Sequence, residues 1–182
     1  MHYTLVLFLV LLTSTMSVGQ NIKWNADSPL VWEDFQGPVD ASSRFHAQTQ
    51  SGVKYSFRWQ SSYSKTTYTF EVFSYCDKSL SWVKSSKATD KLLAHEQLHF
   101  DISELHARKL KQTIAMTTFT KRYDSEIKNL FKENQREREL MQEQYDRETE
   151  HMKNRDNQLK WQQYVAEELN RLEKYTGSEI VN

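Results

Sequence analysis

Neither proline nor glycine occurs between Ser86 and Gly177, a stretch that makes up the second half of the chain. Proline breaks helices and glycine weakens them, so a stretch this long without either is typical of long helices. Apolar residues within it recur nearly every four positions, which is the period of a helix that buries one face. The sequence therefore predicts that this half of the chain is helical.

Three helical stretches are predicted in this half. The first extends from about Thr89, a residue type that often caps a helix, to about Met116. The second begins near Asp124. After residues 134–139, which include no apolar side chain, the periodic pattern returns and continues to Leu172. We interpret the mixed charges between the apolar positions as a solvated helix face rather than a nucleic-acid site. The inward-facing candidates of the first helix are Leu92, Leu93, His99, Leu105 and Ile114.

The first half, from Asn21 to about Lys84, favours strands because Val, Tyr, Phe, Thr and Trp cluster there in short stretches separated by Gly, Pro and Ser. Residues 53–59 and 68–72 alternate apolar with polar side chains, which predicts two half-buried antiparallel strands, and the alternation stops at Phe73. The predicted fold class is therefore α+β, with a small antiparallel sheet in the N-terminal half followed by a helical half.

A signal peptide is predicted at the N-terminus. Residues 4–12 form an apolar run that is too short to span a bilayer as a helix but suits a secretory hydrophobic region. Small residues on both sides of Val18 favour cleavage before Gln20. An uncleaved membrane anchor is the alternative, which the shortness of the run disfavours. We therefore expect a signal peptide over residues 1–19, one domain over residues 20–182, and a secreted or periplasmic protein without stable membrane insertion.

The composition narrows the kind of partner and the kind of metal site. Lys and Arg number 24, as do Asp and Glu, so the formal net charge is zero and we expect no nucleic-acid partner. The single cysteine, Cys76, excludes a disulfide scaffold and every multi-cysteine zinc module, and we expect it to be a buried small apolar residue. Any metal ion must therefore be bound by histidines and carboxylates.

The pattern H-E-x-x-H occurs on the first predicted helix, formed by His95, Glu96 and His99. Positions four apart lie one turn apart on the same helix face, so both imidazoles can bind one Zn²⁺ and leave room for a water molecule. Glu96 follows the first ligand and can take a proton from that water as a general base. The pattern predicts zinc-dependent peptide hydrolysis, and the alternative is a chance pair of histidines on a surface helix.

Further segments accompany this motif. They are residues 30–37, 81–83, 95–102, 107–110 and 145–151, together with Glu104, Gln158 and Trp161. These segments resemble a bacterial family of unknown function that is described as predicted secreted zinc-dependent proteases, and residues 145–151 are similar to its Tyr-Asp-x-x-Thr-x-His segment. Members usually have glycine where this chain has Met152. The likeness covers about Trp24 to Trp161 and implies a zincin-like fold, a zinc cofactor and protease activity.

A catalytic zinc usually has three protein ligands, so one is needed beyond the motif. His106 lies seven residues after His99, which is about 10 Å along a helix and too far for one ion. A separate helix can fold back and present His151 from the opposite side, and the resemblance points to the same residue. His151 is therefore the predicted third ligand, and Asp146 and Glu148 are the carboxylate alternatives.

Other polar residues have weaker predicted roles. Tyr145 is a candidate catalytic residue that could donate to the developing oxyanion, and its alternative is a core aromatic. Asp101 or Asp146 could accept the second N–H of a ligand histidine. Glu104 and Arg108 are four residues apart and are predicted to pair on the helix surface.

Three functions follow as hypotheses. The first is a secreted zinc peptidase whose peptide or protein substrate docks along a strand edge. The second is a binding module at the cell envelope that holds zinc without catalysis. The third is a helical assembly protein in which the two histidines of the motif are incidental. The oligomeric state does not follow from the sequence.

Overall fold

The structure, a computed structural model, describes residues 21–63, 66–177 and 179–181. The predicted signal peptide, residues 1–19, lies outside the described residues. None of the helices in the described part of the chain has the length and apolar character needed to cross a membrane.

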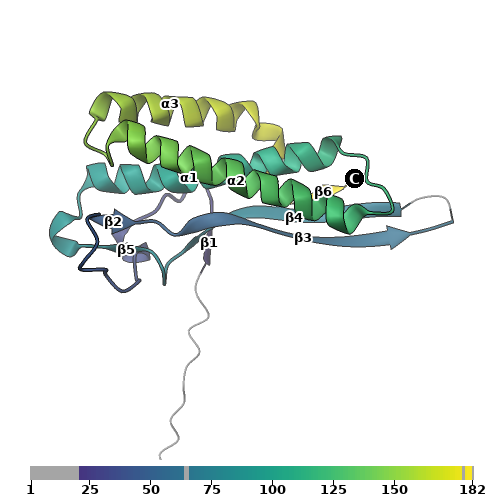
Figure 1. Cartoon of the computed structure of the whole chain (residues 1–182), viewed down its shortest axis with the longest axis horizontal. Helices are drawn as coiled ribbons and strands as arrows, with labels where there is room; N and C mark the ends of the chain where they lie inside the picture. The colour runs from purple at the N-terminus through teal and green to yellow at the C-terminus, as the bar shows by residue number, and fades with distance from the viewer. Residues whose placement is uncertain (1–20, 64–65, 178, 182) are drawn as a thin grey trace, which may run out of the picture.

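A long antiparallel hairpin forms the centre of the main sheet (Figure 1). It consists of β3 (Ser51–Ser61) and β4 (Thr66–Asp77). The short strands β1 (Asn21–Lys23) and β6 (Glu179–Val181) both pair antiparallel with β4. A separate two-stranded ladder joins β2 (Ala47–Gln48) to β5 (Trp82–Val83).

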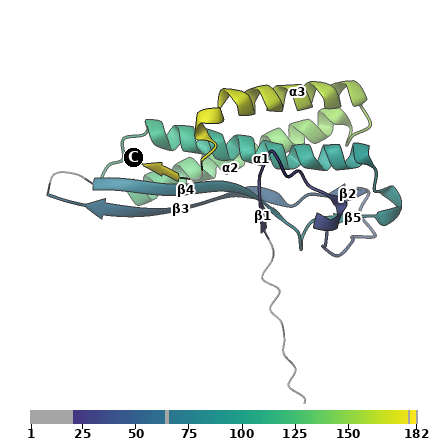
Figure 2. The same cartoon turned by 180° about the vertical axis from the view of Figure 1, so that it is seen from behind.

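The three long helices are α1 (Asp90–Met116), α2 (Tyr123–Thr149) and α3 (Arg155–Arg171). They lie on the same side of the hairpin, and α3 is the one farthest from it (Figures 1 and 2). Helix α1 packs against β3 and β4, and both α2 and α3 pack against α1. Single 3₁₀ turns occur at Trp32–Asp34, Ser85–Lys87 and Glu173–Tyr175. The predicted α+β class, with the sheet first and the helices second, is confirmed.

The start and end of α1 agree with the sequence prediction. The side chain of Thr89 accepts a hydrogen bond from the backbone N–H of Leu92, which satisfies one of the free donors of the first turn. The helix ends at Met116, and the backbone N–H of Thr117 bonds to the carbonyl of Ile114.

The second strand is longer than predicted, because Phe73 does not end it. Phe73 lies on the outer face, where the ammonium group of Lys23 is 4.1 Å from its ring centroid. The inward positions continue with Ser74 and Cys76, both fully buried, so the alternation persists with small residues instead of large apolar ones. The prediction that Cys76 is buried is confirmed.

Residues 134–139 do not separate two helices, since α2 continues through them. Asn134 is buried there, and its side-chain amide donates to the backbone carbonyl of His106 at 2.9 Å. A polar side chain thus takes the inward position that an apolar one usually occupies, and it joins α2 to α1. The boundary between the second and third helices follows Thr149, where α2 ends.

The predicted pair of Glu104 and Arg108 forms, but it is buried rather than on the surface. The two side chains are 2.9 Å apart, and each is at most 7% exposed. Ser74 donates to Glu104 at 2.7 Å, and Arg108 donates to the carbonyl of Leu169 at 2.7 Å. These extra partners compensate the loss of water around both charges and tie α1 to β4 and α3.

Candidate metal centre

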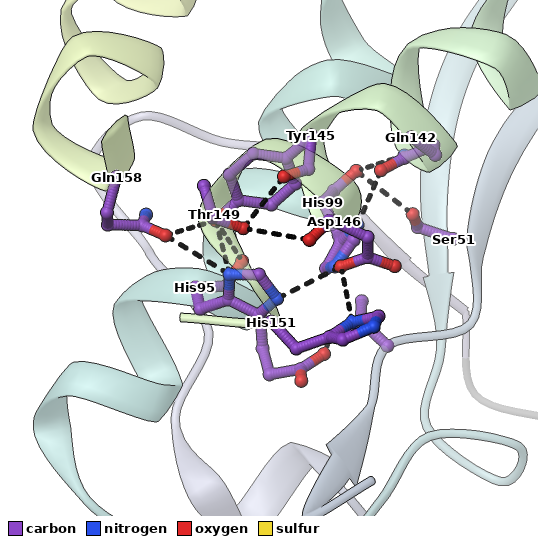
Figure 3. A network of polar contacts seen from close by, with 11 residues as sticks. Ser51, His95, His99, Gln142, Tyr145, Asp146, Thr149, His151 and Gln158 are labelled. Carbon is purple, nitrogen blue, oxygen red and sulfur yellow. Dashed lines mark hydrogen bonds and ion pairs between the residues drawn. The ribbon is translucent and has the colours of Figure 1, made fainter. Parts of the chain in front are cut away.

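His95 and His99 lie one turn apart on α1, and their rings are 4.8 Å apart between centroids. Asp146 of α2 faces them, with its Oδ1 atom 3.2 Å from the Nε2 atom of each ring. His95 is 3% exposed, and the side chain of His99 is 15% exposed. Figure 3 shows the two rings directed toward this carboxylate. Two helices thus bring three ligand-type atoms together.

The distances from Asp146 Oδ1 to the two ring nitrogens fit a bound metal ion. Asp146 Oδ1 is buried and has no hydrogen-bond partner among the described residues, although two ring nitrogens lie 3.2 Å away. Ligand atoms about 2.0 Å from a tetrahedral zinc ion are separated by about 3.3 Å. His95, His99 and Asp146 are the group of histidine and carboxylate side chains, within the described ranges, whose ligand atoms all lie within 4.8 Å of one another.

The charges of the site also fit a cation. Burial alone would raise the pKa of Asp146, but the facing imidazoles of His95 and His99 outweigh it and hold the pKa well below its usual range. Burial alone would lower the pKa of His99, but Asp146 and the charge of Glu96 outweigh it and raise the pKa. The carboxylate is therefore ionised and attracts positive charge to the point between the rings.

His151, the predicted third ligand, lies beside this group rather than in it. Its Nδ1 atom is 3.4 Å from Asp146 Oδ1, and its side chain is 39% exposed. Its ring packs at 4.7 Å, between centroids, against Phe45 on the opposite wall of the cleft. Asp146, one of the two carboxylate alternatives, occupies the third position in this structure.

The turn after α2 determines where His151 lies. Glu150, His151 and Met152 have φ angles of 50°, 52° and 74°, in the left-handed region that favours glycine. The N–H of His151 bonds to the carbonyl of Asp146 at 3.0 Å, which closes the helix end. The left-handed geometry at Met152 agrees with the glycine that resembling sequences carry there.

The other ring nitrogens of the two histidines face polar side chains. His99 Nδ1 is 2.5 Å from the side-chain oxygen of Gln142, and His95 Nδ1 is 2.7 Å from the hydroxyl of Tyr145. Gln158 lies behind Tyr145 on α3 (Figure 3). Burial raises the pKa of Tyr145, so its hydroxyl remains protonated. The hydroxyl lies on the side of His95 opposite the cluster, which does not suit the predicted oxyanion role.

Glu96 shares the site with the two histidines and is 4% exposed. The hydroxyl of Thr49, just after β2, donates to Glu96 Oε2 at 2.7 Å. Sequence reasoning missed Thr49 because it lies 47 positions before Glu96 and no local pattern joins them. The hydrogen bond holds the carboxylate in one orientation toward the cleft.

A cleft of about 590 Å³ contains the site. Strand β2 and the residues next to it form one wall, and the turn after α2 forms the other. Its lining residues are Arg44, Phe45, His46, Ala47, Gln48, Thr49, Leu92, His95, Glu96, His99, Asp146, His151, Met152 and Lys153. A second cavity, of about 630 Å³, lies between the three helices and is lined by none of His95, His99 and Asp146.

The remaining candidates lie outside the cluster. Glu148 accepts hydrogen bonds from Gln144 and from the indole N–H of Trp161, and it lines the second cavity. Asp101 accepts hydrogen bonds from Trp24 and Gln97 instead of from a ligand histidine. Neither carboxylate is positioned to contact His95 or His99.

His106 has a different environment from the two histidines of the motif. It is 1% exposed, and neither of its ring nitrogens has a hydrogen-bond partner among the described residues. Burial, together with the charges of Lys109 and Arg138, lowers its pKa to about 3. His106 is therefore a neutral buried residue.

Comparison with known proteins gives one match. The model of a family described as "Bacterial protein of unknown function (DUF922)" matches residues 32–152. This range contains the motif helix, Asp146, His151 and every residue that lines the cleft except Lys153. No curated protein and no solved structure matches the chain.

Proposed function

The chain belongs to the bacterial family of unknown function DUF922, and we propose that within it the protein is a zinc-dependent peptidase that acts outside the cytoplasm. The observation that carries the proposal is the convergence of His95, His99 and Asp146 next to Glu96, within one open cleft. The predicted signal peptide supports the location.

The chain's own residues have distinct roles in this proposal. His95, His99 and Asp146 hold the metal ion, in the two-histidine, one-carboxylate arrangement that some catalytic zinc sites use. Bound zinc would supply an acidified water molecule and polarise the scissile carbonyl. Glu96 accepts a proton from the attacking water and passes it to the departing amine, while Thr49 keeps its carboxylate in place.

The wall formed by β2 supports docking of an extended peptide. Strand β2 pairs with β5 on one edge, and in the described part of the chain this sheet has no further strand. Ala47, Gln48 and Thr49 line the cleft beside His95 and Glu96. A substrate strand added to the free edge of β2 would lie across the site, held by main-chain hydrogen bonds.

The test compares the mature chain, residues 20–182, with two carboxylate-to-amide variants. Glu96→Gln removes the proton acceptor and keeps its shape, so we expect peptide hydrolysis to fall by about 100-fold or more. Zinc content should remain one ion per chain. Glu167→Gln is the matched control, because Glu167 is exposed on α3 and its carboxylate accepts a hydrogen bond from Gln163, another exposed residue of the same helix.

Peptide hydrolysis by Glu96→Gln at the wild-type rate would contradict the proposal. A wild-type protein that binds one zinc ion but cleaves no member of a peptide library would favour the non-catalytic binding module. A protein without stoichiometric zinc would favour the assembly function. Cleavage is read by mass spectrometry, and zinc is measured by elemental analysis.

A further inference from the structure

The ring nitrogen of His99 that faces away from the cluster has a partner that can only accept a hydrogen bond. The side-chain NH₂ of Gln142 donates to the backbone carbonyl of His99 at 2.8 Å, which fixes the orientation of the amide. The amide oxygen therefore faces His99 Nδ1, at 2.5 Å. Since a carbonyl oxygen cannot donate, Nδ1 must carry a hydrogen, so the lone pair of the neutral ring lies on Nε2.

A different set of partners gives the same result at His95. The hydroxyl of Tyr145 donates to the side-chain oxygen of Gln158 at 2.8 Å and lies 2.7 Å from His95 Nδ1. Its one proton is used by Gln158, so its oxygen accepts from His95. The side-chain oxygen of Gln158 is also 3.1 Å from His95 Nδ1 and, as an oxygen, accepts there.

These contacts come from two helices that do not supply the histidines. Gln142 and Tyr145 lie on α2, and Gln158 lies on α3, one turn after Asn154 caps that helix. Tyr145 is 0% exposed and Gln158 is 9% exposed, so water does not replace these partners. The two imidazoles of α1 are thus held by partners from two other helices, and the amide of Gln142 is oriented by its own bond to the backbone of α1.

We propose that Gln142, and Gln158 together with Tyr145, are positioning residues that fix His99 and His95 in the tautomer with a free Nε2 lone pair directed at the metal position. The inference rests on the proposed zinc site. Residues of this kind typically change metal affinity by 10- to 100-fold when they are replaced. Gln142 and Tyr145 act through the histidines and contact neither metal nor substrate.

Gln158 allows a test that separates hydrogen bonding from packing. Its NH₂ group has no hydrogen-bond partner among the described residues, so Gln158→Glu keeps the accepting oxygen and loses no bond. Gln158→Met keeps the shape and removes the acceptor. A packing role predicts that Met is tolerated and a buried Glu is not, whereas the proposed role predicts the opposite order.

The measurement is zinc affinity, by competition with a chromophoric chelator, for the mature wild type and four variants. We expect Gln158→Met and Gln142→Met to bind zinc about 10-fold or more weaker than wild type, and Gln158→Glu to bind at least as tightly. Gln163→Met, on the exposed face of α3, should match wild type. In zinc-bound wild type, ¹H–¹⁵N spectra of the imidazoles should show a protonated Nδ1 in His95 and His99.

The outcomes separate this inference from the proposed function. Equal zinc affinity of the Met variants and the Gln163→Met control would overturn the inference and leave the peptidase intact. Zinc ligation through Nδ1 of either ring would also overturn it. The expected order of affinities in a protein that hydrolyses nothing would support the inference and end the peptidase proposal. A wild type that binds no zinc would overturn both.

Discussion

At the scale of single residues, three histidines of α1 differ because of what faces their rings. His95 and His99 each have an acceptor behind the ring and the carboxylate of Asp146 in front. His106, two turns further along, has no partner for either nitrogen among the described residues and is almost completely buried. The first two are suited to bind a cation, whereas His106 is suited to remain neutral.

The buried state of His106 predicts a pH dependence of stability. Its pKa is lowered from 6.5 to about 3, so the unfolded chain takes up this proton below about pH 6.5 and the folded chain does not. Stability is therefore lost as pH falls from 6.5 toward 3. Lowering the pH from about 7.5 to about 5 should therefore reduce the free energy of unfolding by about 2 kcal/mol through this one group.

The variant His106→Leu removes the imidazole that takes up this proton and puts an apolar side chain of similar size in its place. We expect its free energy of unfolding, measured by urea titration, to decline less than that of wild type over this pH interval, by about 2 kcal/mol. Titrations in the presence of a chelator exclude an effect of metal loss. Parallel pH profiles for the two proteins would contradict the neutral, buried state.

Sequence reasoning found some residues of the site and missed others for physical reasons. His95, Glu96 and His99 are recognisable because a helix brings positions four apart onto one face. Asp146 was only an alternative, because the choice between it and His151 depends on backbone angles that no residue pattern near Met152 reveals. Contacts such as those of Thr49 and Gln142 depend on how distant segments pack.

At the scale of helices and strands, the turn between α2 and α3 is the element that places His151 beside the metal centre. Its three consecutive residues with positive φ, from Glu150 to Met152, include no glycine. Each such residue costs about 1 kcal/mol relative to glycine at the same angles.

This strain predicts that glycine is favourable at position 152. Met152→Gly should raise the free energy of unfolding by about 0.5 kcal/mol, because the relief of the left-handed angle exceeds the entropy that glycine adds to the unfolded chain. Gln163→Gly, inside α3, is the control and should lower it by about 1 kcal/mol. Thermal unfolding of both variants measures the difference. An equal loss of stability in the two variants would contradict the positive φ angle at Met152.

The boundaries of the elements were predictable where polar side chains face water and not where they face inward. The limits of α1 follow from Thr89 and from an apolar face that continues to Ile114. The continuation of β4 beyond Phe73 and of α2 through residues 134–139 did not follow. In both places a buried polar side chain, Ser74 or Asn134, takes an inward position and makes a hydrogen bond to α1.

At the scale of the whole molecule, the site lies at one end of the helical layer. The N-terminal part of α1, the C-terminal part of α2 and the start of α3 meet there, beside β2 and β5 (Figures 1 and 2). The other end holds an aromatic cluster formed by Tyr68, Phe70, Phe119 and Tyr123. The α+β class followed from the two patterns of the sequence, but the meeting of three helix ends at the site depends on their packing.

The most direct test is anomalous X-ray diffraction at the zinc edge, from crystals of the mature wild type grown with zinc. We expect one strong peak per chain, about 2.0–2.2 Å from His95 Nε2, His99 Nε2 and Asp146 Oδ1, with a remaining position open toward Glu96 and β2. The absence of a peak between these atoms, or a zinc ion with all positions filled by protein atoms, would contradict the account.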